Sequence, residues 1–196
     1  MYACYTAYYL ITDGFIQGRA LTEVAADCRQ YLAFIEKESE PLFNIALSFC
    51  RTIETTCDED VGYTFNSHQF LKDHHHLPVF MAEYDFGTLC SRFWSGQYKD
   101  LENVAQATLT SVSANLHSSL KIPETLFLSS MSLLLRNASV RLPNWPELQA
   151  IVVSNQQQLK KYTDNCTSNF LHKYLLIQAE LAALEESAFD AMDLFE

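Results

Sequence analysis

The chain has 196 residues, of which 48% are hydrophobic, enough to bury a sizeable core in one domain. Acidic residues outnumber basic residues by 24 to 13, and the formal net charge is −11 at pH 7. Because this charge repels phosphate backbones and anionic lipid surfaces, we expect neither a nucleic-acid partner nor a membrane partner.

Apolar residues recur at helical spacing in five stretches of the chain. The stretches are Leu21–Ile35, Leu42–Ile53, Ala82–Phe93, Phe127–Leu134 and Phe170–Leu184. In the first of them, positions 21, 24, 25, 28, 31, 32 and 35 are apolar. Residues three and four apart share one face of a helix, so each stretch predicts an amphipathic helix. Pro41 and Pro78 precede two of the stretches and are suited to a first helical turn.

Turn signals separate these stretches. They lie at residues 13–18, 58–67, 95–96 and 143–146, where Gly, Pro, Asp, Asn and Ser are concentrated. Helices that alternate with short connections form helical hairpins, and we expect about nine helices in all. The sequence therefore predicts an all-α fold of stacked antiparallel helical hairpins, an α-solenoid of the tetratricopeptide-like (TPR-like) kind.

A test for tetratricopeptide units gives two partial matches. Such units recur about every 34 residues and place small or apolar residues at fixed offsets, so that paired helices approach closely. Ala179, Ala191 and Phe195 occupy the small, small and aromatic positions of one unit. The weaker match comprises Leu89, Gly96, Tyr98, Leu101 and Ala105, in which Gly96 forms the turn and Tyr98 begins the second helix. Both lack the terminal proline of the unit, so the pattern is TPR-like rather than an orthodox repeat.

The chain reads as one helical-repeat domain over residues 1–196. Within it we expect two sub-blocks, 1–57 and 76–196, joined by a polar loop over residues 58–75. Apolar helix faces at both ends have no partner in the sequence, and solenoids usually end in polar capping repeats. We therefore expect the domain to be a fragment of a larger chain.

Three motifs near the C-terminus resemble a known family. They are Asn155-Gln156-x-x-Leu159-Lys160-Lys161-Tyr162, then Asn169-Phe170-Leu171-His172-Lys173-Tyr174, then Gln178-Ala179-Glu180. They resemble the helical-repeat middle region of large bacterial signalling kinases, which hold a serine/threonine kinase, an AAA-type ATP-binding module, a GAF sensor and a histidine kinase in one polypeptide. Gly18-x-x-Leu21, Phe93-x-x-Gly96-x-Tyr98 and Pro123-x-x-x-Phe127 extend the resemblance over nearly the whole chain. Tyr162 and Thr167 depart from it, standing where the family has tryptophan and proline.

The resemblance implies a non-catalytic scaffold or relay segment of a two-component signalling kinase. Its partners would be proteins: the neighbouring kinase, ATPase or sensor domains of the same chain, or a partner peptide. None of the kinase or nucleotide-binding motifs of the family lies in these residues. Two alternatives stay open, a stand-alone helical adaptor that binds a partner peptide and a small metal-dependent helical enzyme.

The metal-dependent alternative depends on His74, His75 and His76, which have acidic residues nearby in sequence. Metal ligands must converge on one point, whereas three consecutive residues of a helix point about 100° apart. His68 and His75 are seven residues apart and would align only on one unbroken helix. We therefore interpret this segment as a polar connection and assign no metal-binding residue.

Other candidate groups also favour structural roles. Asp58-Glu59-Asp60 lacks the spacing of a calcium loop, and Glu185-Glu186 lies at the turn of the last hairpin. Lys173 follows His172, where a histidine-kinase acceptor is normally followed by an acidic residue, so we interpret His172 as a partly buried packing residue. The sequence assigns no catalytic residue, no cofactor-binding residue and no cofactor. Exposed aromatics, including Phe93-Trp94 and Trp145, are the better candidates for a contact surface.

The expected location is the cytoplasm. No run of about 18 uncharged apolar residues is present to span a bilayer, and Met1–Thr12 lacks the positive region of a signal peptide. The six cysteines are scattered without a Cys-x-x-Cys pair, which favours buried thiols in a reducing compartment.

Overall fold

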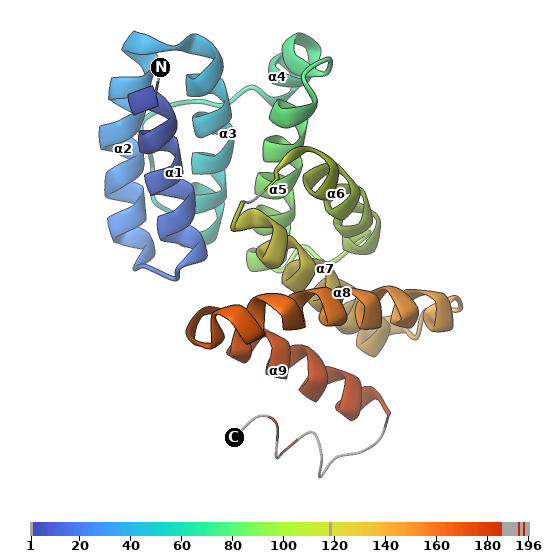
Figure 1. Ribbon diagram of the computed structural model, residues 1–196. Helices are drawn as coiled ribbons and strands as arrows, with labels where there is room; N and C mark the ends of the chain where they lie inside the picture. The colour runs from blue at the N-terminus through green and yellow to red at the C-terminus, as the bar shows by residue number, and fades with distance from the viewer. Residues whose placement is uncertain (1, 118, 186–191, 193, 195–196) are drawn as a thin grey trace.

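The fold is all-helical. The computed structural model describes residues 2–117, 119–185, 192 and 194, and over these residues it contains nine helices and no strand (Figure 1). The helices are α1 (Tyr2–Ile16), α2 (Leu21–Glu38), α3 (Glu40–Cys57), α4 (Ser67–His74), α5 (Pro78–Trp94), α6 (Leu101–Asn115), α7 (Lys121–Val140), α8 (Trp145–Asn165) and α9 (Thr167–Leu184). The predicted all-α fold is confirmed.

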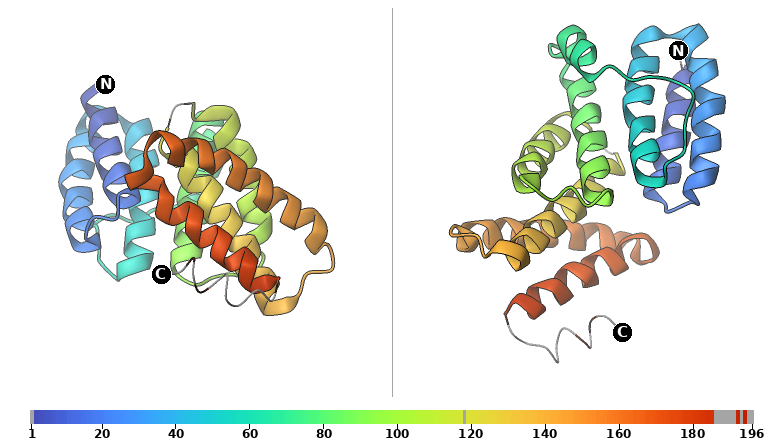
Figure 2. Two further views of the ribbon diagram at one scale, coloured as in Figure 1. Left: turned by 60° about the horizontal axis from the view of Figure 1, so that its bottom comes forward. Right: turned by 180° about the vertical axis from the view of Figure 1, so that it is seen from behind.

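Helices pack on their neighbours in the chain. Each helix contacts the next one, except that α3 packs on α5, which the short α4 also contacts. In addition, α1 meets α3, α5 meets α7, and α7 meets α9. Figures 1 and 2 show α1, α2 and α3 side by side, while α8 and α9 lie across their direction at the other end of the molecule. This sequence-local pattern is the one expected for stacked helical hairpins.

The apolar stripes seen in the sequence form the core. Leu42, Ile45, Ala46, Phe49 and Ile53 of α3 are all buried, and so are Ala82, Phe86, Leu89 and Phe93 of α5. The Phe49 and Phe86 rings stack with their centroids 6.1 Å apart, which joins α3 to α5. Gly87 brings the two helices close, and the Thr52 hydroxyl donates a hydrogen bond of 3.0 Å to its carbonyl. The core is therefore continuous across the connection between α3 and α5.

The connection expected as a polar loop over 58–75 contains helix α4. Its start is fixed by Asn66, whose side-chain oxygen accepts a hydrogen bond of 3.0 Å from the Gln69 backbone amide. Phe70 is buried and stacks on Tyr84 of α5 with 5.3 Å between ring centroids. The cap at Asn66 and the buried Phe70 ring are enough to hold the two turns of α4 in place. Neither feature gives a long apolar stripe, so the sequence pattern did not predict this helix.

Two expected boundaries also move. Asp13 and Gly14 belong to the last turns of α1, and the chain turns at Gly18, where φ is +72°. Gly96 forms a turn as expected, again with φ of +72°, but the following helix begins at Leu101 and not at Tyr98. Of the residues in the first tetratricopeptide match, Ala179 is buried, whereas Ala191 and Phe195 lie outside the described residues.

No helix in the described part of the chain combines the length and the apolar character required to cross a bilayer.

Candidate functional site

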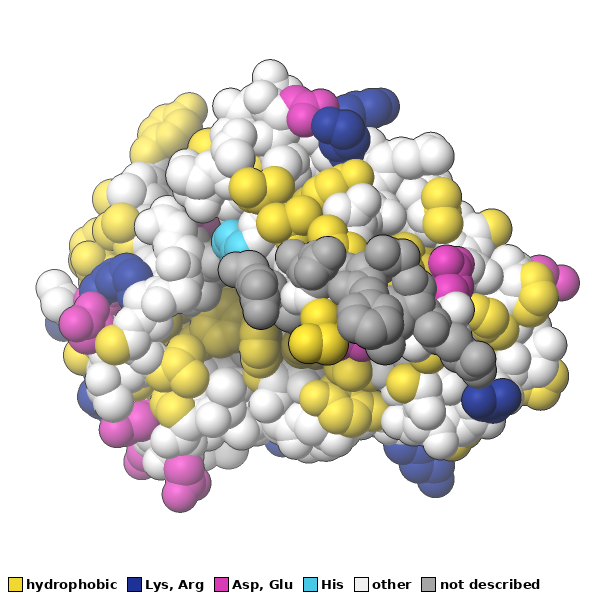
Figure 3. Space-filling view, turned by 90° about the horizontal axis from the view of Figure 1, so that it is seen from below, with side chains coloured by type: hydrophobic (Ala, Val, Ile, Leu, Met, Phe, Trp, Pro, Cys, Tyr) yellow, Lys and Arg dark blue, Asp and Glu magenta, His cyan; other side chains and the backbone are white. Residues whose placement is uncertain are grey.

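A groove of about 930 Å³ opens where several helix ends meet. Its walls come from the turn between α1 and α2, the last residues of α3 and α5, and the first halves of α7 and α9. Figure 3, which views the molecule from below, shows hydrophobic side chains gathered in a hollow on that face. The lining therefore combines segments that lie far apart in the sequence.

Large apolar side chains form much of the groove wall. Trp94, the last residue of α5, is 47% exposed, and Leu120, at the start of α7, is 37% exposed. Phe15, at the end of α1, and Leu176 of α9 also line the groove and are half-buried. Partly exposed large apolar side chains on a concave surface are typical of ligand and protein binding sites. Of the aromatics singled out in the sequence, Trp94 lies in the groove, whereas Phe93 is buried and Trp145 is half-buried against the core.

A buried ion pair lies at the groove. Lys173 of α9 donates a hydrogen bond to the Glu124 carboxylate of α7, and both residues are buried. The Lys173 ammonium also lies 5.6 Å from the centroid of the Phe127 ring. Burial raises the pKa of Glu124, and the positive charge of Lys173 opposes this rise. The pair joins α7 to α9 and places a fixed ammonium–carboxylate dipole beside the apolar walls.

Arg19 and His172 lie at the edge of the groove. Arg19 donates to Asp27 at 2.7 Å and to Glu23 at 3.4 Å, and its side chain is 40% exposed. His172 is exposed and lines the groove, so its interpretation as a partly buried packing residue is wrong. The protein atoms beside the ring displace some of its water and, with the neighbouring Lys173 charge, lower the pKa of His172, which favours the neutral ring at pH 7. His172 therefore lies on the side of α9 that borders the groove and is open to solvent.

A second buried cluster fixes the start of α7. Lys121 donates to the Glu83 carboxylate of α5 at 2.8 Å, and the Tyr8 hydroxyl of α1 donates to the same carboxylate. The Lys121 ammonium lies 4.7 Å from the centroid of the Tyr8 ring. Burial, followed by the charge of Glu83, raises the pKa of Tyr8, so its hydroxyl stays protonated. This cluster ties three helices together one residue away from Leu120 in the groove wall.

The histidines of the metal hypothesis do not converge. The His74 ring stacks between Phe70 and Phe80, with centroids 4.7 Å and 5.4 Å away, and its Nδ1 lies 3.0 Å from the Phe70 carbonyl oxygen. His75 Nδ1 lies 3.0 Å from the Lys72 carbonyl oxygen. Across the described residues, no three His, Cys, Asp or Glu side chains are grouped closely enough to hold a metal ion. His74 therefore packs α4 onto α5, which gives the metal-dependent alternative no support.

The acidic segments have local partners. Asp58 ends α3 in the left-handed conformation with φ of +56°, and the Asp60 carboxylate accepts a hydrogen bond of 2.7 Å from the Gly62 amide. Glu59 lies 3.5 Å from Arg29. Glu185 accepts from the Gln149 side chain at 3.0 Å, and Glu186 lies outside the described residues.

Among the described residues, no hydrogen bond joins His172 to a cysteine or a hydroxyl near the groove. The Ser168 hydroxyl contacts the Cys166 sulfur at 3.7 Å. All six cysteines lie within the described ranges and are free thiols. The site thus offers apolar walls, one internal ion pair and, at its edge, the partly exposed Arg19 guanidinium, which suit binding of an apolar surface that carries an acidic group.

Comparison of the chain with models of protein families, with curated proteins and with solved structures gives no match in any of the three.

Proposed function

We propose that this chain is a non-catalytic helical-repeat scaffold that holds a protein segment in the groove between α1–α2, α7 and α9. The expected occupant is an amphipathic helix with an apolar face and an acidic flank. The observation that supports this most is the placement of Trp94 and Leu120, two partly exposed apolar side chains, beside the buried Lys173–Glu124 pair.

The apolar face of the occupant is set by the groove walls. Aromatic side chains contribute most to protein interfaces when they sit in a pocket from which water is excluded. Trp94 stands at a helix end, where the Phe93 and Trp94 rings pack edge to face with centroids 5.0 Å apart. A side chain held in this way loses little conformational entropy on binding. Trp94 is therefore suited to be the main apolar contact.

The acidic flank is set by the charges at the edge of the groove. The charged residues that line the groove are Arg19, Lys173 and Glu124; Lys173 is paired with Glu124, and Arg19 is paired with Asp27 and Glu23 beside the lining. The Arg19 side chain is 40% exposed, so it is the basic group that an incoming acidic side chain can reach. An acidic side chain that reaches Arg19 would gain a charged hydrogen bond at the rim.

The resemblance to signalling kinases supports one source for this helix, a neighbouring domain of a longer chain, which makes the segment a relay. The alternative source is a separate partner, which makes it an adaptor. The groove is bordered by segments of several helices, so it would receive one inserted helix in the same way whether that helix comes from a neighbouring domain or from a separate partner.

Peptide display tests the proposal. Peptides selected on the wild-type chain are expected to carry apolar residues at helical spacing together with Asp or Glu. Binding is followed by Trp94 fluorescence in a Trp145→Phe background, since the chain has two tryptophans. Leu176→Glu places a charge in the groove wall, whereas Leu171→Glu places the same charge on the same helix at an exposed residue outside the lining.

We expect Leu176→Glu to weaken binding at least about tenfold, equivalent to roughly 1.4 kcal/mol, and Leu171→Glu to leave it unchanged. Equal binding by both variants, or selection of basic peptides, would overturn the proposed occupant.

A further inference from the structure

Residues 186–196, which follow α9 in the sequence, have the chemistry expected of the groove occupant. Their sequence is Glu-Ser-Ala-Phe-Asp-Ala-Met-Asp-Leu-Phe-Glu, with four acidic residues and no basic residue. At helical spacing, Ala191, Met192 and Phe195 share one face, and Asp190 and Asp193 lie on the opposite face. The sequence of this segment therefore predicts an acidic amphipathic helix.

The structure describes two residues of this segment, Met192 and Leu194, and both have helical backbone. The Met192 side chain, on the predicted apolar face, is 61% exposed. Met192 can therefore enter a binding site without first leaving the core of the protein.

The groove lies within reach of the segment. Helix α9 supplies the groove wall from Ser168 to Leu176 and ends at Leu184, eight residues beyond Leu176. Eight residues of helix span about 12 Å, at a rise of about 1.5 Å per residue. The backbone turns at Glu185. A helix that begins near residue 187 and runs back along α9 brings Phe195, again eight residues further on, to the level of Leu176.

We propose that residues 186–196 fold back along α9 and place Met192 and Phe195 against the apolar wall of the groove, so that the chain carries a competing occupant of its own binding site. This contact rests on the proposed function, since it uses the same groove and the same kind of occupant. Glu196 follows Phe195 at the flank of the apolar face, where Arg19 is the partly exposed basic group at the groove edge. The chain as a whole is acidic, so the apolar side chains supply the attraction and charge contributes only at this point.

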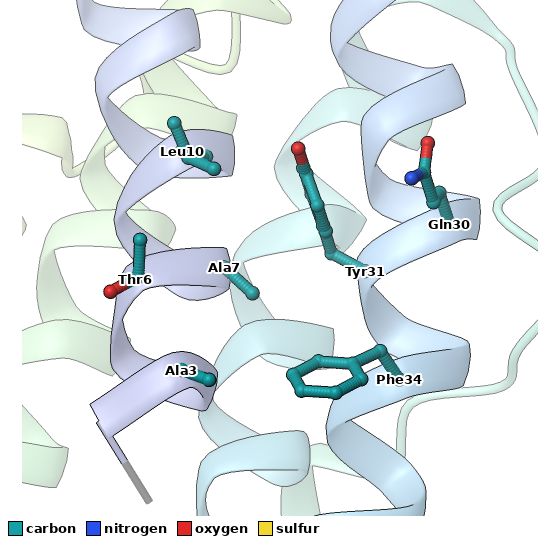
Figure 4. Close-up of a pocket in the computed structure, with 7 residues that line it drawn as sticks. All are labelled: Ala3, Thr6, Ala7, Leu10, Gln30, Tyr31 and Phe34. Atoms are coloured by element: carbon teal, nitrogen blue, oxygen red, sulfur yellow. The ribbon is translucent and has the colours of Figure 1, made fainter.

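A second hollow on the surface fits this segment less well. It has a volume of about 500 Å³ and lies between α1 and α2, where Figure 4 shows Ala3, Thr6 and Ala7 of α1 opposite the rings of Tyr31 and Phe34 of α2. Its lining contains no charged side chain and no residue of α9 among the described residues. An acidic segment that starts at the end of α9 gains neither a charge partner nor a wall of its own helix there.

The covalent connection favours this segment over an outside peptide. A short linker between two binding groups gives an effective concentration on the order of millimolar. A segment whose intrinsic dissociation constant is about half of that concentration covers the groove about two thirds of the time. The apparent affinity for an outside peptide is then reduced about threefold, because only the uncovered fraction can bind.

Variants of the full chain test this contact. Phe195→Glu and Met192→Glu each place a charge on the apolar face of the segment, and Ser187→Glu adds the same charge before that face as the control. In a Trp145→Phe background, Trp94 emission should shift to longer wavelength in both test variants, because water reaches the groove wall, and stay unchanged in the control. Circular dichroism checks that each variant is helical.

Peptide binding gives a second readout. The display-selected acidic peptide should bind each test variant at least about threefold more tightly than the wild type, and the control variant as tightly as the wild type. Unchanged Trp94 emission, or equal peptide affinity for the wild type and both test variants, would overturn the inference, while the Leu176→Glu comparison still decides whether the groove binds an outside helix. If display selects no peptide, the proposed function fails, and Trp94 emission alone decides whether the segment contacts the groove.

Discussion

Replacing Lys121 by methionine is expected to destabilise the protein strongly. The Lys121 and Glu83 side chains are 1% and 5% exposed, and the ammonium lies 2.8 Å from the carboxylate. Removing one partner of a buried ion pair leaves the other charge uncompensated and costs about 3–5 kcal/mol. Since domains are typically stable by roughly 5–15 kcal/mol, this single change would remove between about a fifth and all of the total.

A paired substitution separates the cost of an orphaned charge from the cost of lost packing. Glu83→Leu combined with Lys121→Met removes both charges, and such replacements are often neutral or stabilising. The Tyr8 hydroxyl then loses its acceptor, which costs roughly 1–3 kcal/mol. The double variant is therefore expected to be more stable than Lys121→Met alone, and adding Tyr8→Phe should recover most of the remaining loss.

Urea unfolding followed by far-ultraviolet circular dichroism measures each of these free energies. Lys37→Met, at an exposed position of α2, serves as the control and should change stability by less than about 0.5 kcal/mol. A Lys121→Met variant within about 1 kcal/mol of the wild type would refute the reasoning, and so would a double variant that loses the sum of the two single losses.

Three further outcomes follow from other parts of the core. Burial raises the pKa of Glu124 above its ordinary value of 4.5, so the folded protein favours the protonated carboxyl. The stability that this provides is complete below pH 4.5 and is lost as the pH rises through the folded pKa. Urea unfolding at successive pH values should show this decline for the wild type and not for Glu124→Gln. Gly87→Ala should raise the unfolding free energy by about 0.5–1 kcal/mol, because an added Cβ would lie 3.6 Å from its nearest neighbours, whereas Gly87→Leu should lower it by roughly 1–3 kcal/mol. Alkylation followed by mass spectrometry should label Cys166 in the native protein and Cys90 only after unfolding, because complete burial shields the Cys90 thiol and raises its pKa; native labelling of Cys90 would contradict this.

The sequence predicts the helices well where one apolar stripe faces the core. The stripe from Leu42 to Ile53 is buried as expected, because periodicity reports directly which face is covered. It misses α4, whose order depends on the cap at Asn66 and one buried ring, Phe70. An eight-residue helix with a single buried residue has too little periodicity to distinguish it from a polar loop.

The groove was only partly predictable. Trp94 could be chosen as a contact residue because large aromatics at helix ends often lie on binding surfaces. Its neighbours in the groove come from α1, α2, α3, α7 and α9, and only the tertiary fold brings these helices to one place. A local signal for the buried charges did exist: Glu124 is the one charged residue between Ile122 and Leu135. A lone charge in an apolar helix indicates a buried partner but does not identify it, and Lys173 lies 49 residues away.

Hydrogen–deuterium exchange with and without a display-selected acidic amphipathic peptide tests the central claim most directly. We expect the peptide to slow exchange in the segments that form the groove, residues 15–21, 120–127 and 168–176. Exchange at the outer face of α1, residues 2–10, should stay unchanged. Protection confined to that outer face, or no change within the three groove segments, would contradict the account.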